Sequence, residues 1–334
     1  MKVYYFKEDI RNVTEMYYDV MLSALRKKGY ELILLDKATI RSARTIEKGS
    51  YILATSLLAF FKCWLVGHKK FIYWYQGITP EEDKMIFGSQ FRYIVFSWIE
   101  KLSLKKIKYK IGVSKYLFKH YERKYGMQIP EEEVFIMPCY NSDFHKESFF
   151  VEDKYKKNTF CFAGGMQVWQ GFEDIVKLFV QIENKYPNAF LKVYSKDKVE
   201  AKKILDKYHV ANYLLDCVPQ EEMEKVLADS KFGFIIREDN IINNVATPTK
   251  LGTYIGNGII PVYTPTIHAY ADLKGKYKYL CCADVSNLLE ALEPYMTQTI
   301  DNNDIMKDYS KLFKDYFNKE KYIDKLVEYL DLKK

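Results

Sequence analysis

Two basic side chains occupy positions where a cation is unusual. Arg237 follows the apolar run 234–236, which has the pattern of a strand, and a polar loop follows it. Lys250 falls in the first turn of a helix that we expect to begin near Pro248, with Thr247 as its cap. A lysine there opposes the helix dipole unless an anion neutralises it. The pattern therefore predicts a diphosphate held by both cations and by helix N–H groups, and a solvated loop with incidental charge is the alternative.

A second candidate is a glycine turn within residues 160–171. An apolar run leads through Gly164 and Gly165 into a helical pattern. Glycines there let backbone N–H groups approach an anion, and a helix N-terminus adds positive potential. The segment is not a GxGxxG motif, so a tight strand-to-helix turn explains it equally well.

Short apolar runs alternate with helical periodicity along the whole chain, and this order predicts parallel sheets. We expect strands at Val3–Phe6, Glu31–Leu35, Ile52–Ala54, Phe71–Tyr75, Ile111–Val113, Phe135–Met137, Thr159–Ala163, Phe190–Tyr194, Tyr213–Leu215, Phe232–Ile236 and Ile259–Val262. Helix faces are expected at Val13–Leu25, Phe172–Tyr186 and Val199–Tyr208, near 220–230 and 249–256, and throughout from Asp284 onward.

The polar segment Ser142–Lys157 lacks periodicity, and we interpret it as a linker. The fold class predicted is α/β: two Rossmann-like, doubly wound domains facing a cleft, with a helical C-terminal tail. Open parallel sheets bind ligands beyond the carboxyl ends of their strands, so the cleft would hold a small ligand.

Composition excludes several classes of protein. The chain has 334 residues, of which 48% are hydrophobic and 28% charged, as in globular rather than disordered proteins. The six cysteines form no CxxC pair and the five histidines no metal-ligand spacing, so we expect reduced thiols and no metal. The N-terminus has no secretory pattern, and the longest apolar run, 51–66, is too short to span a bilayer. We therefore expect a cytoplasmic protein.

The formal charge of +7 is unevenly distributed. Residues 101–124 carry nine basic side chains and one acid, Glu122. Just before them, an apolar stripe has helical spacing; it consists of Phe91, Ile94, Val95, Trp98, Ile99 and Leu102. We expect this stripe to pack on its own sheet. The alternative is that residues 91–124 lie on an anionic membrane surface, at the inner face of the membrane. A nucleic-acid partner is not expected, because no nucleic-acid-binding motif accompanies the lysines.

Together, the glycine turn and the 232–263 region resemble the C-terminal half of a GT-B fold glycosyltransferase of the family 4 (glycosyl transferases group 1) type. The family shows a Pro-x-Lys-x-x-Glu-Tyr-x-x-x-Gly stretch before a Pro-Val strand, and the matching residues here are Pro248, Lys250, Tyr254, Gly258, Pro261 and Val262. More loosely, the segments 74–77, 111–114 and 137–143 resemble parts of the first domain. Two positions depart from the family: Thr253 replaces a glutamate that holds the nucleotide ribose, and Gln170 stands where a lysine is frequent.

The resemblance implies a retaining glycosyltransferase that needs no metal. It would move a sugar from a UDP- or GDP-linked donor to a glycan or lipid-linked acceptor, in cell-surface polysaccharide or glycoconjugate synthesis. Domain 1–145 would face the acceptor, domain 155–315 would bind the donor, and helix 316–334 would pack back across them.

The same resemblance assigns roles to individual residues. Arg237 and Lys250 would stabilise the leaving diphosphate. The remaining donor-binding candidates are Gly164, Gly165, Glu238, Asn243, Asn244, Thr249 and Thr253, and the acceptor-side candidates are Gln76 and Gly77. Glu81, Glu82 and Asp83 could bind acceptor hydroxyls or could simply begin a helix. Because of the two departures, a non-catalytic GT-B relative that binds nucleotide or glycan in a membrane-associated assembly is the alternative function, and a sugar-nucleotide epimerase is a third.

Overall fold

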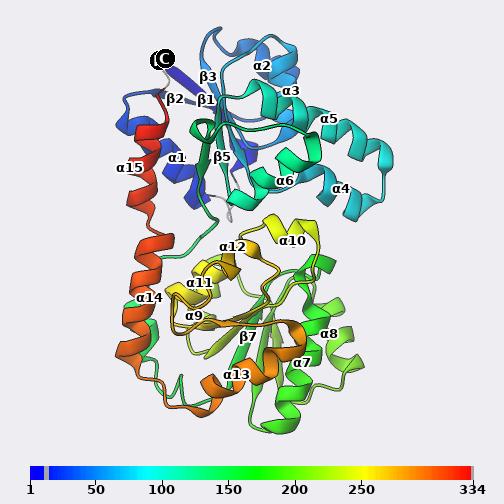
Figure 1. Ribbon diagram of the computed structural model, residues 1–334, viewed down its shortest axis with the longest axis vertical. Coiled ribbons are helices and arrows are strands. Elements are labelled where there is room, and N and C mark those ends of the chain that lie inside the picture. The colour runs from blue at the N-terminus through cyan, green and yellow to red at the C-terminus, as the bar shows by residue number, and fades with distance from the viewer. Residues whose placement is uncertain (11–14, 332–334) are drawn as a thin grey trace. The chain divides into compact units, whose positions relative to one another are not determined.

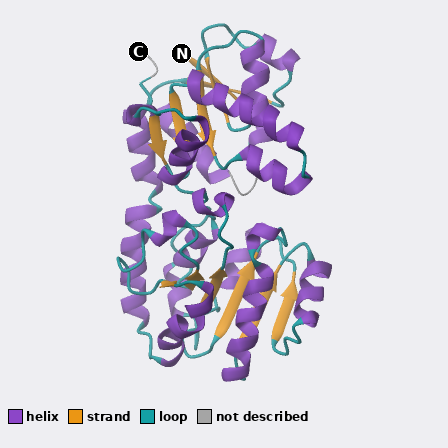
Figure 2. Cartoon of the chain, turned by 45° about the vertical axis from the view of Figure 1, so that its right-hand side comes forward, coloured by secondary structure: helices purple, strands orange, loops and turns teal. Residues whose placement is uncertain are grey.

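The computed structural model describes residues 1–10 and 15–331, and the chain divides into two compact units (Figure 1). Unit 1 comprises Met1–Cys139, Val245–Thr247 and Asn318–Lys334. Unit 2 comprises Tyr140–Asn244 and Pro248–Phe317. Each unit contains one parallel six-stranded sheet with helices packed against it (Figure 2). The chain is therefore an α/β protein with two Rossmann-like halves.

The sheet of unit 1 has the strand order β2-β1-β3-β4-β5-β6. Its strands are β1 (Lys2–Phe6), β2 (Glu31–Leu35), β3 (Tyr51–Ala54), β4 (Phe71–Tyr75), β5 (Tyr109–Gly112) and β6 (Val134–Ile136). Its helices are α1 (Glu15–Lys27), α2 (Ile40–Thr45), α3 (Leu57–Leu65), α4 (Thr79–Phe87), α5 (Gln90–Lys106), α6 (Lys115–Tyr125) and α15 (Lys319–Tyr329). The central strands β3 and β4 are buried along their whole length, as their unbroken apolar sequences predict.

The last helix, α15, completes unit 1 although it lies at the end of the chain. It packs on α1, and Lys27 Nζ contacts Asp324 Oδ1 at 3.1 Å. The hydroxyl of Tyr329 accepts a hydrogen bond from the backbone N–H of Lys110 at 2.9 Å. These contacts connect the C-terminal segment to α1 and to strand β5 of the first sheet.

The sheet of unit 2 has the order β12-β11-β10-β7-β8-β9. Its strands are β7 (Thr159–Ala163), β8 (Phe190–Tyr194), β9 (Tyr213–Asp216), β10 (Phe232–Ile235), β11 (Ile260–Tyr263) and β12 (Cys281–Cys282). Its helices are α7 (Phe172–Lys185), α8 (Lys198–Lys207), α9 (Met223–Leu227), α10 (Ile241–Val245), α11 (Lys250–Gly256), α12 (His268–Ala271), α13 (Leu288–Thr297) and α14 (Asn302–Tyr316). Stacked rings of Phe160, Phe232 and Phe234 join β7 to β10, with centroids 4.8 and 5.2 Å apart.

The predicted strands all form, with ends that differ by at most two residues. The two-residue β12 was missed, because two cysteines carry no alternating pattern. The end of the chain was wrongly expected to be helical throughout: breaks around residues 298–301 and 317–318 separate α13, α14 and α15. The predicted face position Val13 lies outside the described residues.

Segment Ser142–Lys157 is not a plain linker, which corrects the sequence prediction. It contains a 3-10 helix at Lys146–Phe150, and Phe149 is fully buried. Lys154 is 2% exposed and donates to the carbonyl oxygens of Ser148 (2.9 Å) and Asn257 (2.5 Å). The sequence does not show that this segment packs on unit 2, because only a few of its side chains make the contacts and they form no periodic pattern.

The apolar stripe of α5 is also not core. Phe91, Ile94 and Trp98 are 76%, 57% and 54% exposed, and Val95 is exposed as well. Only Ile99 of the stripe is fully buried, because α5 contacts its unit along a face turned away from the other stripe residues. Within residues 1–10 and 15–331, no helix is both long and apolar enough to cross a membrane.

The buried Lys154 predicts a pH dependence of stability. Burial lowers its pKa to about 7, whereas an unfolded lysine titrates near 10.4. Between these values the unfolded chain binds more protons, so stability rises with pH. Between pH ~7 and ~10 we expect the free energy of unfolding of the wild type to rise by about 3 kcal/mol relative to that of Lys154→Met. The melting temperature of the wild type should rise with it. Thermal melts of Lys156→Met, which removes an exposed neighbour, are the control; parallel curves for the wild type and Lys154→Met would contradict the assignment.

Candidate functional site

The glycine turn and the polar loop meet at one edge of the unit 2 sheet. Strand β7 lies between β10 and β8, so the chain leaves β7 toward β8 while β10 pairs on its other side. Gly164 follows the carboxyl end of β7, and Arg237 follows that of β10. This is the point in a doubly wound sheet where strand order reverses and where such sheets bind ligands.

Hydrogen bonds fix both the backbone and the side chain of Arg237. Its backbone N–H donates to Thr264 Oγ1 at 3.1 Å, and its carbonyl accepts from the hydroxyls of Thr264 and Thr266 at 3.0 and 3.1 Å. Its Nη1 donates to the carbonyl oxygen of Trp169, in the glycine turn. The residue is 5% exposed, its Nε has no hydrogen-bond partner among the described residues, and burial lowers its pKa to about 10. An unpaired N–H on a buried guanidinium is costly unless a ligand accepts from it.

Lys250 reaches the same turn from the first residue of α11. Its Nζ donates to Gln170 Oε1 at 2.7 Å and lies 4.1 Å from the centre of the Phe162 ring. It passes so close to Gly164 that a Cβ there would lie 2.8 Å from Nζ. Burial first, and the nearby charge of Arg237 second, hold the pKa of Lys250 well below its ordinary value. Neither cation pairs with a carboxylate of the described chain, so both are available to an anion.

The glycine turn also exposes the first turn of α7. Its N-cap is Gly171, in the left-handed conformation (φ 63°), and no side chain caps the helix. A Cβ at Gly171 would lie 2.4 Å from the Ile236 carbonyl oxygen, so the turn packs directly on the end of β10. Gly165 is partly exposed beside the side chain of Gln167. The helix start and the buried Arg237 thus converge on one position.

The predicted sugar-binding residues lie in the loop after β10. Glu238 is exposed. Asn243 is buried, and its amide donates to the Glu238 carbonyl oxygen at 3.0 Å. The Asn244 amide donates to Asp239 Oδ1 at 2.8 Å and to the Thr266 carbonyl oxygen at 3.1 Å. Both asparagines therefore shape the loop, and contact with a sugar stays a prediction for all three residues.

Two threonines of the motif differ from what the sequence suggested. Helix α11 begins at Lys250 with Thr249 at its N-cap, where no side-chain cap bond forms, so Thr247 is not the cap. Thr247 Oγ1 instead accepts from the Cys139 N–H at 3.0 Å, within unit 1. Thr253 donates its hydroxyl to Asn141 Oδ1 at 3.2 Å. A ribose contact of Thr253 stays a prediction, and it would have to compete with this bond.

Other motif residues have structural roles. The Tyr254 ring lies over Gly233, where a Cβ would be 2.5 Å from it. Pro261 and Val262 belong to the buried strand β11. Sequence analysis missed Trp169, Thr264 and Thr266, which fix Arg237. The position of Thr264, directly after β11, was a usable signal, since the carboxyl ends of neighbouring parallel strands share one edge.

The acceptor-side candidates lie in unit 1, at the carboxyl end of β4. Gln76 is exposed, and with Gly77 it lines a cavity of about 530 Å³. The lining also includes carboxylates and tyrosines, namely Glu8, Asp9, Glu82, Glu100, Tyr73, Tyr75 and Tyr121. Burial raises the pKa of Asp9 to about 6 and that of Glu100 to about 7. Trp74, from the same segment, points the other way and is fully buried against α1, with its ring 4.9 Å from that of Tyr17.

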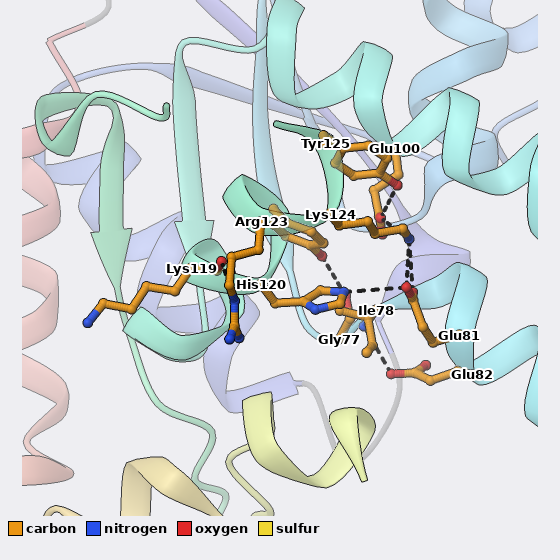
Figure 3. A network of polar contacts seen from close by, with 11 residues as sticks. Gly77, Ile78, Glu81, Glu82, Glu100, Lys119, His120, Arg123, Lys124 and Tyr125 are labelled. Carbon is orange, nitrogen blue, oxygen red and sulfur yellow. Dashed lines mark hydrogen bonds and ion pairs between the residues drawn. The ribbon is translucent and has the colours of Figure 1, made fainter. Parts of the chain in front are cut away.

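A polar network connects this cavity to α6 (Figure 3). Lys124 contacts Glu81 at 2.8 Å and Glu100 at 3.0 Å, and Tyr125 donates to Glu100 at 2.6 Å. Burial raises the pKa of Glu81, but hydrogen bonds from His120 and Lys124 bring it below its usual range. The Glu81 carboxylate is thus paired with Lys124, whereas Glu82 lines the cavity. Among the described residues, no three His, Cys, Asp or Glu side chains gather as metal ligands would.

Comparisons with known proteins give likeness in structure only. No protein-family model matches the chain, and no curated protein matches it in sequence. Anabaena Alr3699/HepE, solved with UDP and glucose, superposes with a TM-score of 0.70 at 9% identity over 99% of both chains. Sucrose-phosphate synthase from Thermosynechococcus elongatus gives 0.69 at 11% over 98% of both chains. S. aureus TarM, in complex with UDP, gives 0.60 at 10% over 84% of this chain, which spans 55% of the TarM chain.

These neighbours are glycosyltransferases, and the likeness to two of them extends over nearly the whole chain. The chain has the GT-B fold. The two parallel six-stranded sheets and the helical C-terminal tail confirm the predicted fold class.

The close packing of Gly164 on Lys250 gives a test of the site. In Gly164→Ala, the added Cβ forces the Lys250 amine away, because it would lie 2.8 Å from Nζ and 3.1 Å from Cε. Only the end of a flexible side chain must move, so the melting temperature should change little. Affinity for inorganic pyrophosphate, measured by calorimetry, should fall about tenfold, since a hydrogen bond to a charged group is worth ~1.5–3 kcal/mol. Wild-type affinity in this variant would show that the position of Lys250 is not needed for anion binding.

Proposed function

We propose that this protein is a glycosyltransferase that uses a nucleotide-diphosphate sugar as its donor. The observation that carries the proposal is the pair of cations, the buried Arg237 and the half-buried Lys250, beside the uncapped start of α7. A diphosphate would accept hydrogen bonds from both side chains and from helix N–H groups. Support also comes from the GT-B neighbours, several of which are solved with UDP or a UDP-sugar.

The chemistry follows from where these charges lie. Cleavage of a sugar–phosphate bond leaves negative charge on the departing diphosphate, and cations already fixed in place stabilise that charge without reorganisation. Lys250 would carry a full charge once the anion is bound, because the anion offsets the burial and the repulsion from Arg237 that lower its pKa. Arg237 would supply its unpartnered Nε–H. Gly164 and Gly165 would let the backbone approach the phosphates.

The finer assignments belong to the same proposal. We assign donor binding to unit 2 and acceptor binding to unit 1, through Gln76, Gly77 and the cavity they line. Glu238, Asn243, Asn244, Thr249 and Thr253 are the further donor-side candidates. Transfer would proceed with retention, as in the family 4 type that the motif resembles, with a UDP- or GDP-linked donor and no metal.

The proposed biological setting is the synthesis of a cell-surface polysaccharide or glycoconjugate. The acceptor would be a glycan or a lipid-linked saccharide, and the protein would act in the cytoplasm or at the inner face of the membrane. One of the two departures from the family motif fits an active site: Gln170 accepts a hydrogen bond from Lys250, which a lysine could not do.

Substitution of either cation tests the donor site. Arg237→Ala and Lys250→Ala should each raise the Kd for a nucleotide-sugar about tenfold or more, because each removes a charge-assisted hydrogen bond worth ~1.5–3 kcal/mol. The measurement is calorimetry or thermal shift against UDP, GDP and their sugars. Lys203→Ala removes an exposed lysine of the same unit and should leave the Kd unchanged. Unaltered affinity in both site variants would refute the assignment.

Catalysis itself is tested by release of free nucleotide diphosphate from a panel of UDP- and GDP-sugars, with and without acceptor saccharides. A glycosyltransferase should release nucleotide faster when an acceptor is present, and Lys250→Ala should abolish that stimulation. Tight binding with no release would indicate a non-catalytic GT-B relative. Release that no acceptor stimulates, with a changed sugar as product, would indicate an epimerase.

A further inference from the structure

Unit 1 carries an exposed apolar surface on α3, α4 and α5, which we call the apolar ridge. Nine large apolar side chains that the structure describes as exposed belong to it: Leu58, Leu65, Met85, Ile86, Phe87, Phe91, Ile94, Val95 and Trp98. Phe61 joins the ridge across helices, since its ring lies 5.6 Å from Trp98 and 6.1 Å from Trp64. Isolated exposed apolar residues are normal, but a concentration of this kind marks an interaction surface.

None of the acidic residues of α4 and α5 is exposed. Every residue of these two helices is described, and their acids are Glu81, Glu82, Asp83 and Glu100. The Glu81, Asp83 and Glu100 side chains are only 14%, 9% and 1% exposed. Figure 3 shows Glu81 and Glu100 directed toward Lys124. The outer surface of the two helices therefore presents apolar and basic side chains without an exposed acid.

Basic residues accompany the apolar ones on both helices. Lys84, Lys105 and Lys106 are exposed, Lys101 is half-buried, and the exposed Arg92 is paired with Asp83. On α5, spacings of three and four residues place Phe91, Ile94, Trp98, Lys101 and Lys105 along one face. A cation at the end of an apolar face can extend toward anionic headgroups while its alkyl chain stays on the apolar surface.

The two helices form a braced hairpin. Arg92 Nε donates to Asp83 Oδ2 at 2.8 Å, and the Arg92 guanidinium lies 4.8 Å from the Phe87 ring centre. Gly88, in the left-handed conformation, ends α4, and Ser89 caps α5 by accepting from the Arg92 N–H. The connection between α4 and α5 projects at the right-hand side of unit 1 in Figure 1. The ridge is therefore a preformed surface rather than one that must fold on binding.

We propose that the apolar ridge docks unit 1 on an anionic lipid bilayer, with Phe91, Ile94 and Trp98 entering the headgroup–acyl boundary. Charge decides between a bilayer and a second copy of this chain: two facing ridges would bring like charges together, whereas anionic headgroups complement them. The proposal rests on the membrane-associated role within the proposed function and names the surface responsible. It shifts the expected membrane contact from residues 91–124 as a whole to α3–α5.

Two lysines of the positive segment 101–124 are paired within the protein and are not part of a basic surface. Lys124 is used by Glu81 and Glu100, and Lys110 is buried and paired with Glu133. Near the apolar ridge, the exposed lysines that remain are Lys105 and Lys106, at the end of α5. A membrane-facing role for these lysines thus depends on the apolar residues beside them.

The test is flotation of the full chain with phosphatidylcholine vesicles that contain or lack phosphatidylglycerol. The wild type should float with the anionic vesicles, and high salt should weaken binding. Phe91→Ser/Trp98→Ser should bind about tenfold or more weakly, because two large apolar side chains no longer enter the bilayer. Lys105→Glu/Lys106→Glu should lose a similar factor on anionic vesicles. Val199→Ser/Lys314→Glu, which alters exposed residues of unit 2, should bind as the wild type does.

Two further measurements keep the proposal separate from folding and from donor binding. Each variant should melt as the wild type does and should bind UDP with unchanged Kd. Loss of vesicle binding with intact UDP binding supports the ridge; loss of UDP binding in the wild type concerns the proposed function alone. A wild type that does not float on anionic vesicles overturns the docking proposal. So does a wild type that forms dimers which Phe91→Ser/Trp98→Ser dissolves, since the occupant would then be a second copy.

Discussion

The physical constraint on which the candidate site depends is the desolvation of two like charges that have no carboxylate partner. Arg237 and Lys250 reach the same glycine turn, and each spends a hydrogen bond on a neutral oxygen, from Trp169 and Gln170 respectively. Burial makes both cations less stable than they would be in water, and their mutual repulsion adds to this. A fold that keeps such a pair must offset this loss of free energy by another interaction. An anionic ligand would supply that interaction. The threonines that hold the Arg237 backbone, and the glycines that admit Lys250, all serve this arrangement.

In unit 1, the buried charged groups beside the cavity are carboxylates rather than cations. Its buried carboxylates are either paired, as Glu81 and Glu100 are with Lys124, or line a cavity with tyrosines. Carboxylate and hydroxyl oxygens suit the hydroxyls of a saccharide, whereas the cations of unit 2 suit a diphosphate. The polarity of each unit thus fits one substrate of the proposed transfer. The same inward pairing of acids leaves the outer face of α4 and α5 apolar and basic.

Much of the fold was predictable because parallel strands are short apolar runs with clear ends, as at β4 and β8. The predictions that the structure contradicts failed for one reason: the contacts that determine these features join residues distant in sequence. The stripe of α5 has the periodicity of a core helix, and nothing local shows that its unit packs against another face. Segment 142–157 looks like a linker because its anchors, Phe149 and Lys154, are too few to form a pattern. In the site, Arg237 and Lys250 were recognisable as misplaced cations. Trp169 was not, because it contributes a backbone carbonyl, which any residue could supply.

The most direct test of the central claim is proton uptake on UDP binding, measured by calorimetry in buffers of different ionisation heat, from neutral to mildly alkaline pH. The bound diphosphate should raise the depressed pKa of Lys250, so the wild type should take up protons from solution and its affinity should fall as pH rises. Lys250→Met, measured alongside, should lack that uptake while still binding UDP weakly through Arg237. Equal proton uptake in wild type and variant would contradict the account, because it would show that no desolvated lysine is charged by the ligand.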